Sequence, residues 1–256
     1  MANCNSADIR NIALIGHGSG GKTTLLECAL FRSKGSDRFG KVTDGTTVSD
    51  YDPEEIKRGF SIAASLAPVS YAGKKINVID TPGFLDFSGE VFQALRVVDA
   101  ALIVVNAKAG LEVGADGSFS ETAVPESEKA NLASYQDMLF EALAETNEDM
   151  MNKYFGGEKF TKDEIHAGLH DGILSGSILP VFCGSALTGA GVDYLFQAIA
   201  DFFPSPLVRN TEQDPEGKPI EIKDDTPTSL FVFKTVADPF VGKMNYFKVL
   251  IVILIG

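Results

Sequence analysis

Residues 11–24 read Asn-Ile-Ala-Leu-Ile-Gly-His-Gly-Ser-Gly-Gly-Lys-Thr-Thr, and this stretch decides the fold. Its first part is a short apolar run that ends in glycine, which predicts a buried strand. Its second part, Gly16 to Thr23, has the spacing of a phosphate-binding loop that closes on lysine and threonine. Lys22 to Phe31 carries leucines and alanine on one face and predicts a helix. The sequence therefore predicts a strand, a glycine-rich turn and a helix, which is the context this motif requires.

The chemistry of such a loop assigns roles to its residues. Glycines let successive backbone N–H groups turn inward around phosphates, and the following helix adds its dipole. We expect Lys22 to reach the β- and γ-phosphates of a nucleotide and the Thr23 hydroxyl to bind Mg²⁺. The expected phosphate contacts are His17, Gly18, Ser19, Gly20, Gly21, Lys22, Thr23 and Thr24.

A second motif, Asp80-Thr-Pro-Gly83, follows a predicted strand at 75–80. Asp80 then lies at the carboxyl end of a strand, where α/β sheets bind ligands. An acid at this place can hold the Mg²⁺ shell, and the N–H of Gly83 can face a γ-phosphate. The same four residues also form a plausible turn. Placed after a phosphate-binding loop and two strands, they indicate catalytic roles for Lys22, Asp80 and Gly83.

The remaining pattern predicts alternating strands and helices with one long loop. Residues 34–59 are polar and glycine-rich, which predicts an exposed loop of the functional kind. Strands are predicted at 61–71, 75–80, 100–105 and 178–183, and helices at 86–98, 126–145, 161–173 and 191–203. Strands are also expected at 229–236 and from Met244 onward.

Composition excludes several classes of function. The 256 residues are 45% hydrophobic and 22% charged, as in a globular protein, and the net charge is −13. Residues 115–172 hold 13 acids and 4 bases, a charge of −9 that does not attract nucleic acid, so we expect no DNA partner. Cys4, Cys28 and Cys183 lack metal-ligand spacing and indicate reduced thiols in a cytoplasm. The longest apolar run, 249–255, is too short to span a bilayer, so no membrane association is expected.

Four stretches of the chain resemble elongation factor G, and more closely its bacterial elongation-factor-G-like relatives. They are Asn11–Leu26, Asp50–Ser65, Ile79–Phe87 and Val181–Leu187. The resemblance implies an α/β P-loop G domain with a mostly parallel sheet, followed by the start of a β-barrel domain. It also implies GTP/GDP and Mg²⁺ as cofactors, the ribosome as partner, a monomeric state and a cytoplasmic location.

The resemblance divides the chain into three parts. Residues 1–204 correspond to the G domain, with an acidic helical segment at 123–174. Residues 205–228 form a linker, and residues 229–256 form a truncated β-barrel domain.

Carried over residue by residue, the family's switch I threonine falls on Ser61, which keeps the Mg²⁺-binding hydroxyl beside Thr23 and Asp80. Gly184, Ser185 and Ala186 fall on the motif whose backbone contacts the guanine carbonyl. Their plain alternatives are a strand residue for Ser61 and a strand-end turn for Ser185-Ala186.

The sequence departs from that family at two places that matter for function. The histidine that helps to position the attacking water is replaced by Phe84, which cannot hydrogen-bond water. The guanine-reading motif Asn-Lys-x-Asp is absent, since Asn106-Ala-Lys-Ala109 has no acid, and one family strand is missing between Gly114 and Ala115. We therefore expect strands 100–105 and 178–183 either to pair directly or to leave a gap in the sheet. A bidentate base contact is worth roughly 1–3 kcal/mol of discrimination, so selection against ATP should be poorer.

Three functions are compatible with these observations. The first is a translation-factor GTPase that hydrolyses GTP in connection with the ribosome. The second is a shortened nucleotide-binding module with little or no turnover. The third is a P-loop ATPase of another family. Binding of GTP, GDP and ATP, followed by turnover with and without ribosomes, distinguishes them.

Overall fold

The computed structural model describes residues 5–105, 129–208, 211–213, 218–221, 229–238 and 241–251. The chain forms two compact units. The first comprises Met1–Lys108 with Pro204–Gly256, and the second comprises Ala109–Phe203. The domain boundaries expected from the sequence stay predictions.

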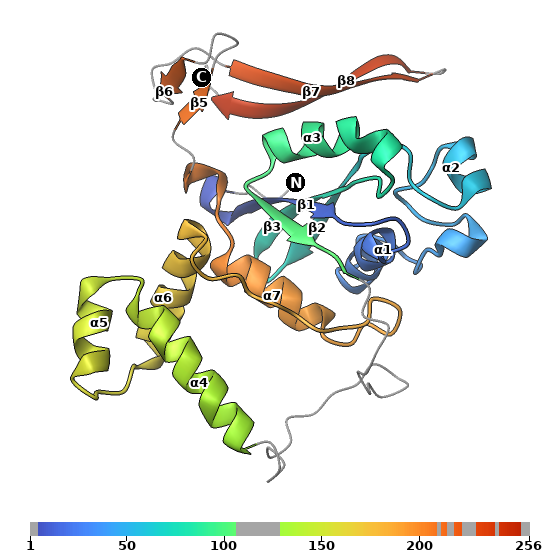
Figure 1. Ribbon diagram of the computed structural model, residues 1–256. Coiled ribbons are helices and arrows are strands. Elements are labelled where there is room, and N and C mark those ends of the chain that lie inside the picture. Colours follow the sequence, from blue (N-terminus) through green and yellow to red (C-terminus); the bar gives the residue numbers. More distant parts are fainter. Residues whose placement is uncertain are drawn as a thin grey trace. The chain divides into compact units, whose positions relative to one another are not determined.

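The first unit contains a four-stranded sheet in the order β2-β3-β1-β4 (Figure 1). These strands are β1 (Ile9–Ile15), β2 (Ser65–Tyr71), β3 (Lys74–Asp80) and β4 (Ala100–Ile103). Strand β1 lies parallel to β3 and β4, with Ile12 opposite Val78 and Ala100, whereas β2 runs antiparallel to β3. The predicted α/β fold with a mostly parallel sheet is confirmed, and both sequence motifs begin at the carboxyl ends of its central strands.

Both faces of the sheet are buried. Ala13 and Ile79 pack with Ala94 of α3 (Ser88–Val97) in one cluster. Because side chains alternate along a strand, Ile12 and Leu14 point to the opposite face, where both are 1% exposed. Helix α1 (Lys22–Arg32) contacts β2 and β3. Parallel strands buried on both faces read as continuous apolar runs, which explains the sequence of β1.

The predicted loop at 34–59 is wrong in part, because it contains helix α2 (Pro53–Arg58). Asp52 caps this helix, proline occupies its first turn, and Glu55 completes a capping box. Strand β2 begins at Ser65, so Ser61 precedes the strand instead of lying within it. The other short helical turns of this unit are η1 (Ser6–Asp8), η2 (Val42–Asp44), η3 (Leu85–Phe87) and η5 (Pro206–Val208).

Two strand pairs lie C-terminal to the four-stranded sheet in the first unit. The predicted C-terminal strands are confirmed as β7 (Ser229–Asp238) and β8 (Gly242–Ile251), which pair antiparallel and fit the start of a β domain. The expected linker holds a short pair, β5 (Thr211–Gln213) and β6 (Pro219–Glu221). Phe231 and Phe233 of β7 pack against the cluster of Ala13, Ile79 and α3.

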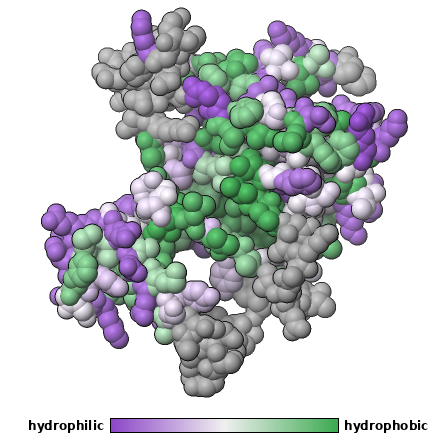
Figure 2. All heavy atoms as spheres, in the orientation of Figure 1, coloured by the Kyte–Doolittle hydropathy of each residue, from purple (hydrophilic) through white to green (hydrophobic). Residues whose placement is uncertain are grey.

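The second unit contains helices joined by turns and, at 176–191, a stretch without helix. It contains α4 (Lys129–Ala144), α5 (Glu148–Phe155), α6 (Lys162–Ser175) and α7 (Val192–Phe202). The capping box of Thr161 and Glu164 is confirmed, whereas α5 was not foreseen. Over α5, hydrophilic and hydrophobic side chains lie side by side in Figure 2, and Met151 and Phe155 of this helix are 40% and 80% exposed.

The predicted strand at 178–183 is wrong, because these residues form no strand. Its direct pairing with 100–105 is wrong as well, since β4 pairs only with β1 among the described strands. The apolar pattern of 178–183 suits a strand, but a strand forms only where its backbone makes hydrogen bonds with a neighbouring strand. Asn106 to Ala109 and the junction of Gly114 with Ala115 lie outside the described residues.

Candidate functional site

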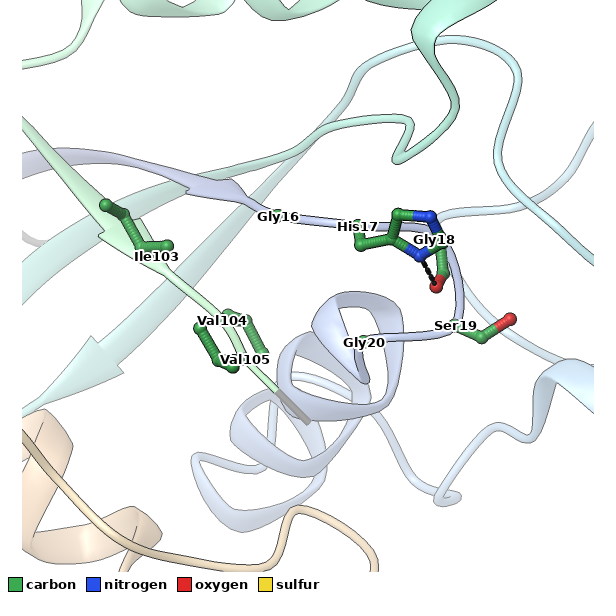
Figure 3. A pocket seen from close by; sticks show the side chains of 8 residues that line it. All are labelled: Gly16, His17, Gly18, Ser19, Gly20, Ile103, Val104 and Val105. Atoms are coloured by element: carbon green, nitrogen blue, oxygen red, sulfur yellow. Dashed lines mark hydrogen bonds between the residues drawn. The ribbon is translucent and has the colours of Figure 1, made fainter. Parts of the chain in front are cut away.

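The loop between β1 and α1 is built on backbone conformations that glycine allows. Gly16 has φ +140°, and a Cβ there would lie 2.3 Å from the carbonyl oxygen of Val104. Gly21 is left-handed, with φ 97°, and is the N-cap of α1. Figure 3 shows the loop passing from Gly16 to Gly20 beside the end of β4. The glycine spacing of the motif is therefore a geometric requirement of this turn.

A cavity of about 520 Å³ opens on this loop. Its lining comprises Gly16, His17, Gly18, Ser19, Gly20, Ile103, Val104 and Val105 (Figure 3). This volume lies within the range of small-molecule sites. No side chain caps the N-terminus of α1, so the first amides of that helix and its dipole remain available to an anion.

The ammonium of Lys22 lies inside the loop. Its Nζ donates to the carbonyl oxygens of Gly16 at 2.9 Å and His17 at 3.0 Å, and the residue is 6% exposed. Burial lowers the pKa of Lys22, and the nearby Asp80 carboxylate opposes that shift. A cation held among loop carbonyls is positioned to exchange them for phosphate oxygens.

The second motif packs directly against the first. The N–H of Gly18 donates to the carbonyl oxygen of Gly83 at 3.0 Å, and Thr81 Oγ1 donates to that of Leu14 at 2.7 Å. A Cβ on Gly83 would lie 2.4 Å from Gly18 N and 2.6 Å from Lys22 Nζ. Only glycine fits between the loop and the lysine.

The structure brings together three residues that the sequence analysis expected to bind Mg²⁺. Thr23 Oγ1 donates to Asp80 Oδ2 at 2.6 Å and lies 3.3 Å from Ser61 Oγ. Ser61 Oγ in turn donates to Asp50 Oδ1 at 2.8 Å. The role of Asp50 was not predicted from sequence, because the residue falls in an expected exposed loop, whereas in the structure it is only 4% exposed. The available signal was its place in an acidic run shortly before Ser61.

The oxygen atoms of this cluster fit a hard divalent cation. Among the described residues, Asp80 Oδ1 and Asp50 Oδ2 are buried without a hydrogen-bond partner. Burial raises the pKa of Asp80 to about 7, against the opposing hydrogen bond from Thr23, and burial also raises the pKa of Asp50. Unpartnered carboxylate oxygens and hydroxyls are the donors that Mg²⁺ prefers. The described residues contain no metal-binding group of three or more His, Cys, Asp or Glu, so the hydroxyls are needed.

Two buried carboxylates hold the backbone that carries these groups. Glu55 Oε1 accepts hydrogen bonds from the amides of Ile62 at 2.8 Å and Ala63 at 3.0 Å. Glu27 Oε1 accepts from the amide of Val48 at 2.6 Å. Glu55 is 2% exposed and Glu27 is 0% exposed. Segments on both sides of Asp50 are thus fastened to α1 and α2 by side chains that the sequence pattern did not single out.

Phe84 lies over the loop within an aromatic group. Its ring centroid is 4.7 Å from that of Phe60 and 6.3 Å from that of His17. A Cβ on Gly18 would lie 2.9 Å from Phe84 Cζ. The position where the resemblance expects a histidine therefore carries an apolar contact with the loop.

Gly184, Ser185 and Ala186 belong to the second unit, where Ser185 begins a turn. Its N–H donates to the carbonyl oxygen of Ala190 at 2.9 Å, and its carbonyl oxygen accepts from Gly189 at 2.8 Å. A Cβ on Gly184 would lie 2.7 Å from the carbonyl oxygen of Ala190. The turn leads into α7, and a role for these residues in base recognition stays a prediction.

The raised pKa of Asp80 predicts how the metal-free protein responds to pH. Between the unfolded value of 3.8 and about 7 the folded state binds more protons than the unfolded state. The contribution of Asp80 to stability is therefore fully present below the unfolded value and is lost as the pH rises through the folded pKa. We expect Asp80→Asn to remove this contribution, so that the variant gains stability over the wild type at about pH 8 but not at about pH 4.

Urea unfolding in EDTA at both pH values measures this difference. Asp137→Asn, on an exposed position of α4, is the matched control and should leave the profile unchanged. An equal change in the free energy of unfolding by Asp80→Asn at both pH values would contradict the raised pKa of Asp80.

Comparison with known proteins places this geometry in a family. Residues 7–205 match the protein-family model described as elongation factor Tu GTP binding domain. The crystal structure of ttk003000868 from Thermus thermophilus is similar, with a TM-score of 0.83 and 27% sequence identity. The match covers 96% of this chain and 46% of that chain, so this chain spans about half the length of that relative. Among the described residues, no helix has both the length and the apolar character to cross a bilayer.

Proposed function

The chain belongs to the elongation factor Tu GTP-binding domain family, and on that premise we propose that it binds GTP and GDP with Mg²⁺ and hydrolyses GTP in connection with the ribosome. The supporting observation is the cluster of Lys22, Thr23, Ser61 and Asp80 at the carboxyl ends of β1 and β3. Within this family, the proposal assigns the chain to the elongation-factor-G-like branch that its motifs resemble.

The roles of the residues follow from their positions. The amides of Ser19 and of Gly21 to Thr24 and the Lys22 ammonium bind the phosphates, whereas the amides of Gly18 and Gly20 already donate to the carbonyl oxygens of Gly83 and His17. Thr23, Ser61 and Asp80 would hold Mg²⁺, and Asp50 accepts the hydroxyl hydrogen of Ser61, which would leave the lone pairs of that oxygen available to a cation. When bound, Mg²⁺ neutralises charge on the β- and γ-phosphates. Gly83 lets the backbone after Asp80 approach the loop and Lys22.

The aromatic group of Phe84 and Phe60 supports a second candidate, a nucleotide-binding module with slow turnover. Phosphoryl transfer depends on positioning a water molecule and on electrostatic stabilisation. A phenyl ring next to Gly18 supplies an apolar wall but no hydrogen bond to water. Catalytic help for hydrolysis must then come from another residue or from a partner.

Nucleotide binding tests the proposal and its specificity. We expect fluorescent GTP and GDP to bind in the presence of Mg²⁺, with GTP favoured over ATP by about tenfold or less, since no Asn-Lys-x-Asp motif reads the base. The third candidate, an ATPase of another family, would instead favour ATP. A preference for GTP over ATP of more than about a thousandfold would contradict the inference that the absence of Asn-Lys-x-Asp weakens base selection.

Turnover separates the two remaining candidates. GTP hydrolysis that ribosomes accelerate supports the enzyme, whereas binding without stimulated hydrolysis supports the module. Phe84→His restores a side chain that can orient water, and we expect it to raise ribosome-stimulated hydrolysis by about tenfold or more. Phe92→His, on an exposed position of α3, is the matched control and should leave hydrolysis unchanged.

A further inference from the structure

The β7–β8 hairpin packs along α3 and near the start of β4. Arg96 of α3 lies over the ring of Phe231, with its Cζ 5.0 Å from the ring centroid. Lys248 Nζ lies 3.5 Å from Oδ1 of Asp99, the residue between α3 and β4. These contacts hold one end of the hairpin along α3.

Lys234, in the middle of β7, makes a different kind of contact. Its Nζ donates to the carbonyl oxygen of Ala64 at 2.6 Å and to Glu90 Oε2 at 2.9 Å. The Lys234 side chain is 9% exposed and that of Glu90 is 24% exposed. A largely buried lysine that meets a carboxylate and a carbonyl is held in one orientation, because either partner left alone would be an uncompensated polar group.

The same Glu90 oxygen also accepts the amide hydrogen of Ala64 at 2.7 Å. Together with Glu55, which takes the amides of Ile62 and Ala63, it binds three consecutive N–H groups. These three residues follow Ser61, whose hydroxyl is 3.3 Å from Thr23 Oγ1. The position of Ser61 is therefore set by the segment 62–64, whose amides donate to Glu55 and Glu90. Lys234 in turn donates to Glu90 and fixes its orientation.

A second contact joins the hairpin to the other side of this segment. Burial raises the pKa of Tyr51, and the nearby Tyr246 of β8 raises it further, so the two side chains lie close together. Tyr51 lies between Asp50, which accepts the Ser61 hydroxyl, and Asp52, which caps α2. The hairpin thus contacts the loop at Ala64 through Lys234 and comes close to its other arm at Tyr51.

We infer that the β7–β8 hairpin is part of the nucleotide site, with Lys234 and Tyr246 acting as positioning residues for the loop that carries Asp50 and Ser61. The inference rests on the proposed function for the identity of the ligand. Docking of the hairpin and binding of nucleotide with Mg²⁺ then favour one another, because both need the same arrangement of Ser61 to Ala64.

Hydrogen exchange of the nucleotide-free full chain tests the positioning step. Lys234→Met keeps most of the side-chain volume and removes the charge. We expect exchange of the amides of Ile62 to Ala64 to accelerate by roughly tenfold. Lys243→Met, on the exposed end of β8, is the matched control and should not change it. Unchanged exchange in Lys234→Met would overturn the inference whatever the protein binds.

A Mg²⁺ titration of fluorescent GDP binding tests the link to the ligand. Lys234→Met should raise the Mg²⁺ concentration at half-saturation by about fivefold and leave the affinity in EDTA unchanged. Lys234→Arg should recover part of this effect, which a merely structural defect would not allow. Equal losses with and without Mg²⁺ would overturn the inference. No Mg²⁺-dependent binding by the wild type would instead contradict the proposed function, and the exchange result would still decide the positioning role.

Tyr246→Phe provides a second variant in case Lys234→Met does not fold. It removes one hydroxyl and retains the ring, and we expect it to raise the Mg²⁺ midpoint by about twofold. Tyr135→Phe, an exposed residue of α4, is its control. A midpoint equal to that of the wild type in Tyr246→Phe would exclude the second contact from the inference.

Discussion

Lys22→Ala is expected to weaken binding of GTP and GDP by about 100-fold or more, equivalent to roughly 2.7 kcal/mol. The Lys22 ammonium lies inside the loop, with two carbonyl oxygens at 2.9 and 3.0 Å. A hydrogen bond to a charged group contributes roughly 1.5–3 kcal/mol, and alanine supplies no donor in its place. Equilibrium binding of fluorescent GTP and GDP in Mg²⁺ measures the loss.

The matched control for this prediction is Lys57→Ala, on an exposed position of α2. It removes the same charge from the same unit without touching the loop and should change the affinity by less than about twofold. Circular dichroism of Lys22→Ala checks that the fold is retained, since the substitution also leaves two carbonyl oxygens without their donor. Retention of near wild-type affinity by Lys22→Ala would contradict the assigned phosphate site.

Gly83→Ala is expected to abolish nucleotide binding and to destabilise the first unit by about 1–3 kcal/mol. The added Cβ would lie 2.4 Å from Gly18 N, 2.6 Å from His17 C and 2.6 Å from Lys22 Nζ. Two of these atoms belong to backbone, so relief requires the loop to move away from Asp80 and the lysine to leave its position. Thermal unfolding and fluorescent GDP binding measure the two effects.

Gly89→Ala is the matched control for Gly83→Ala. Its Cβ would have no neighbour within 4 Å, and the residue lies in α3. We expect this variant to bind nucleotide normally and to be more stable by roughly 0.5–1 kcal/mol, because alanine loses less backbone entropy than glycine in a helix. Normal GDP affinity in Gly83→Ala would show that the loop tolerates the displacement and would refute the argument from close approach.

The elements that the sequence predicted well are those with a local signal. The strand ending at Ile15, the glycine turn and helix α1 combine an apolar run, a spacing rule and helical periodicity. The capping box of Thr161 and Glu164 is likewise a local device. Such elements can be predicted because each residue's neighbours in sequence supply most of the relevant physics.

Elements that depend on distant partners were predicted poorly. The apolar segment 178–183 has strand-forming residues but no ladder, so it forms no strand. Helix α2 was not predicted, because the polar, glycine-rich composition of residues 34–59 indicated a loop although Asp52 is a good N-cap residue. The predicted start of β2 was too early, since Ser61 to Ala64 are held by Glu55 and Glu90 instead of by a neighbouring strand.

By itself the sequence determined the α/β class and the glycine-rich loop between β1 and α1, and it predicted roles for Lys22, Thr23 and Asp80, since glycine spacing and strand-end acids are readable in one dimension. The role of Ser61 was predicted from the family resemblance alone. Only the tertiary structure decided that Asp50 is buried beside Ser61 and that Glu55, Glu90 and Lys234 hold the following backbone. Burial turns an ordinary loop acid into an unpartnered oxygen donor, and burial depends on contacts between residues far apart in the chain. The glycine-rich loop is therefore visible in sequence, whereas the side chains that hold Ser61 and the backbone after it are visible only in three dimensions.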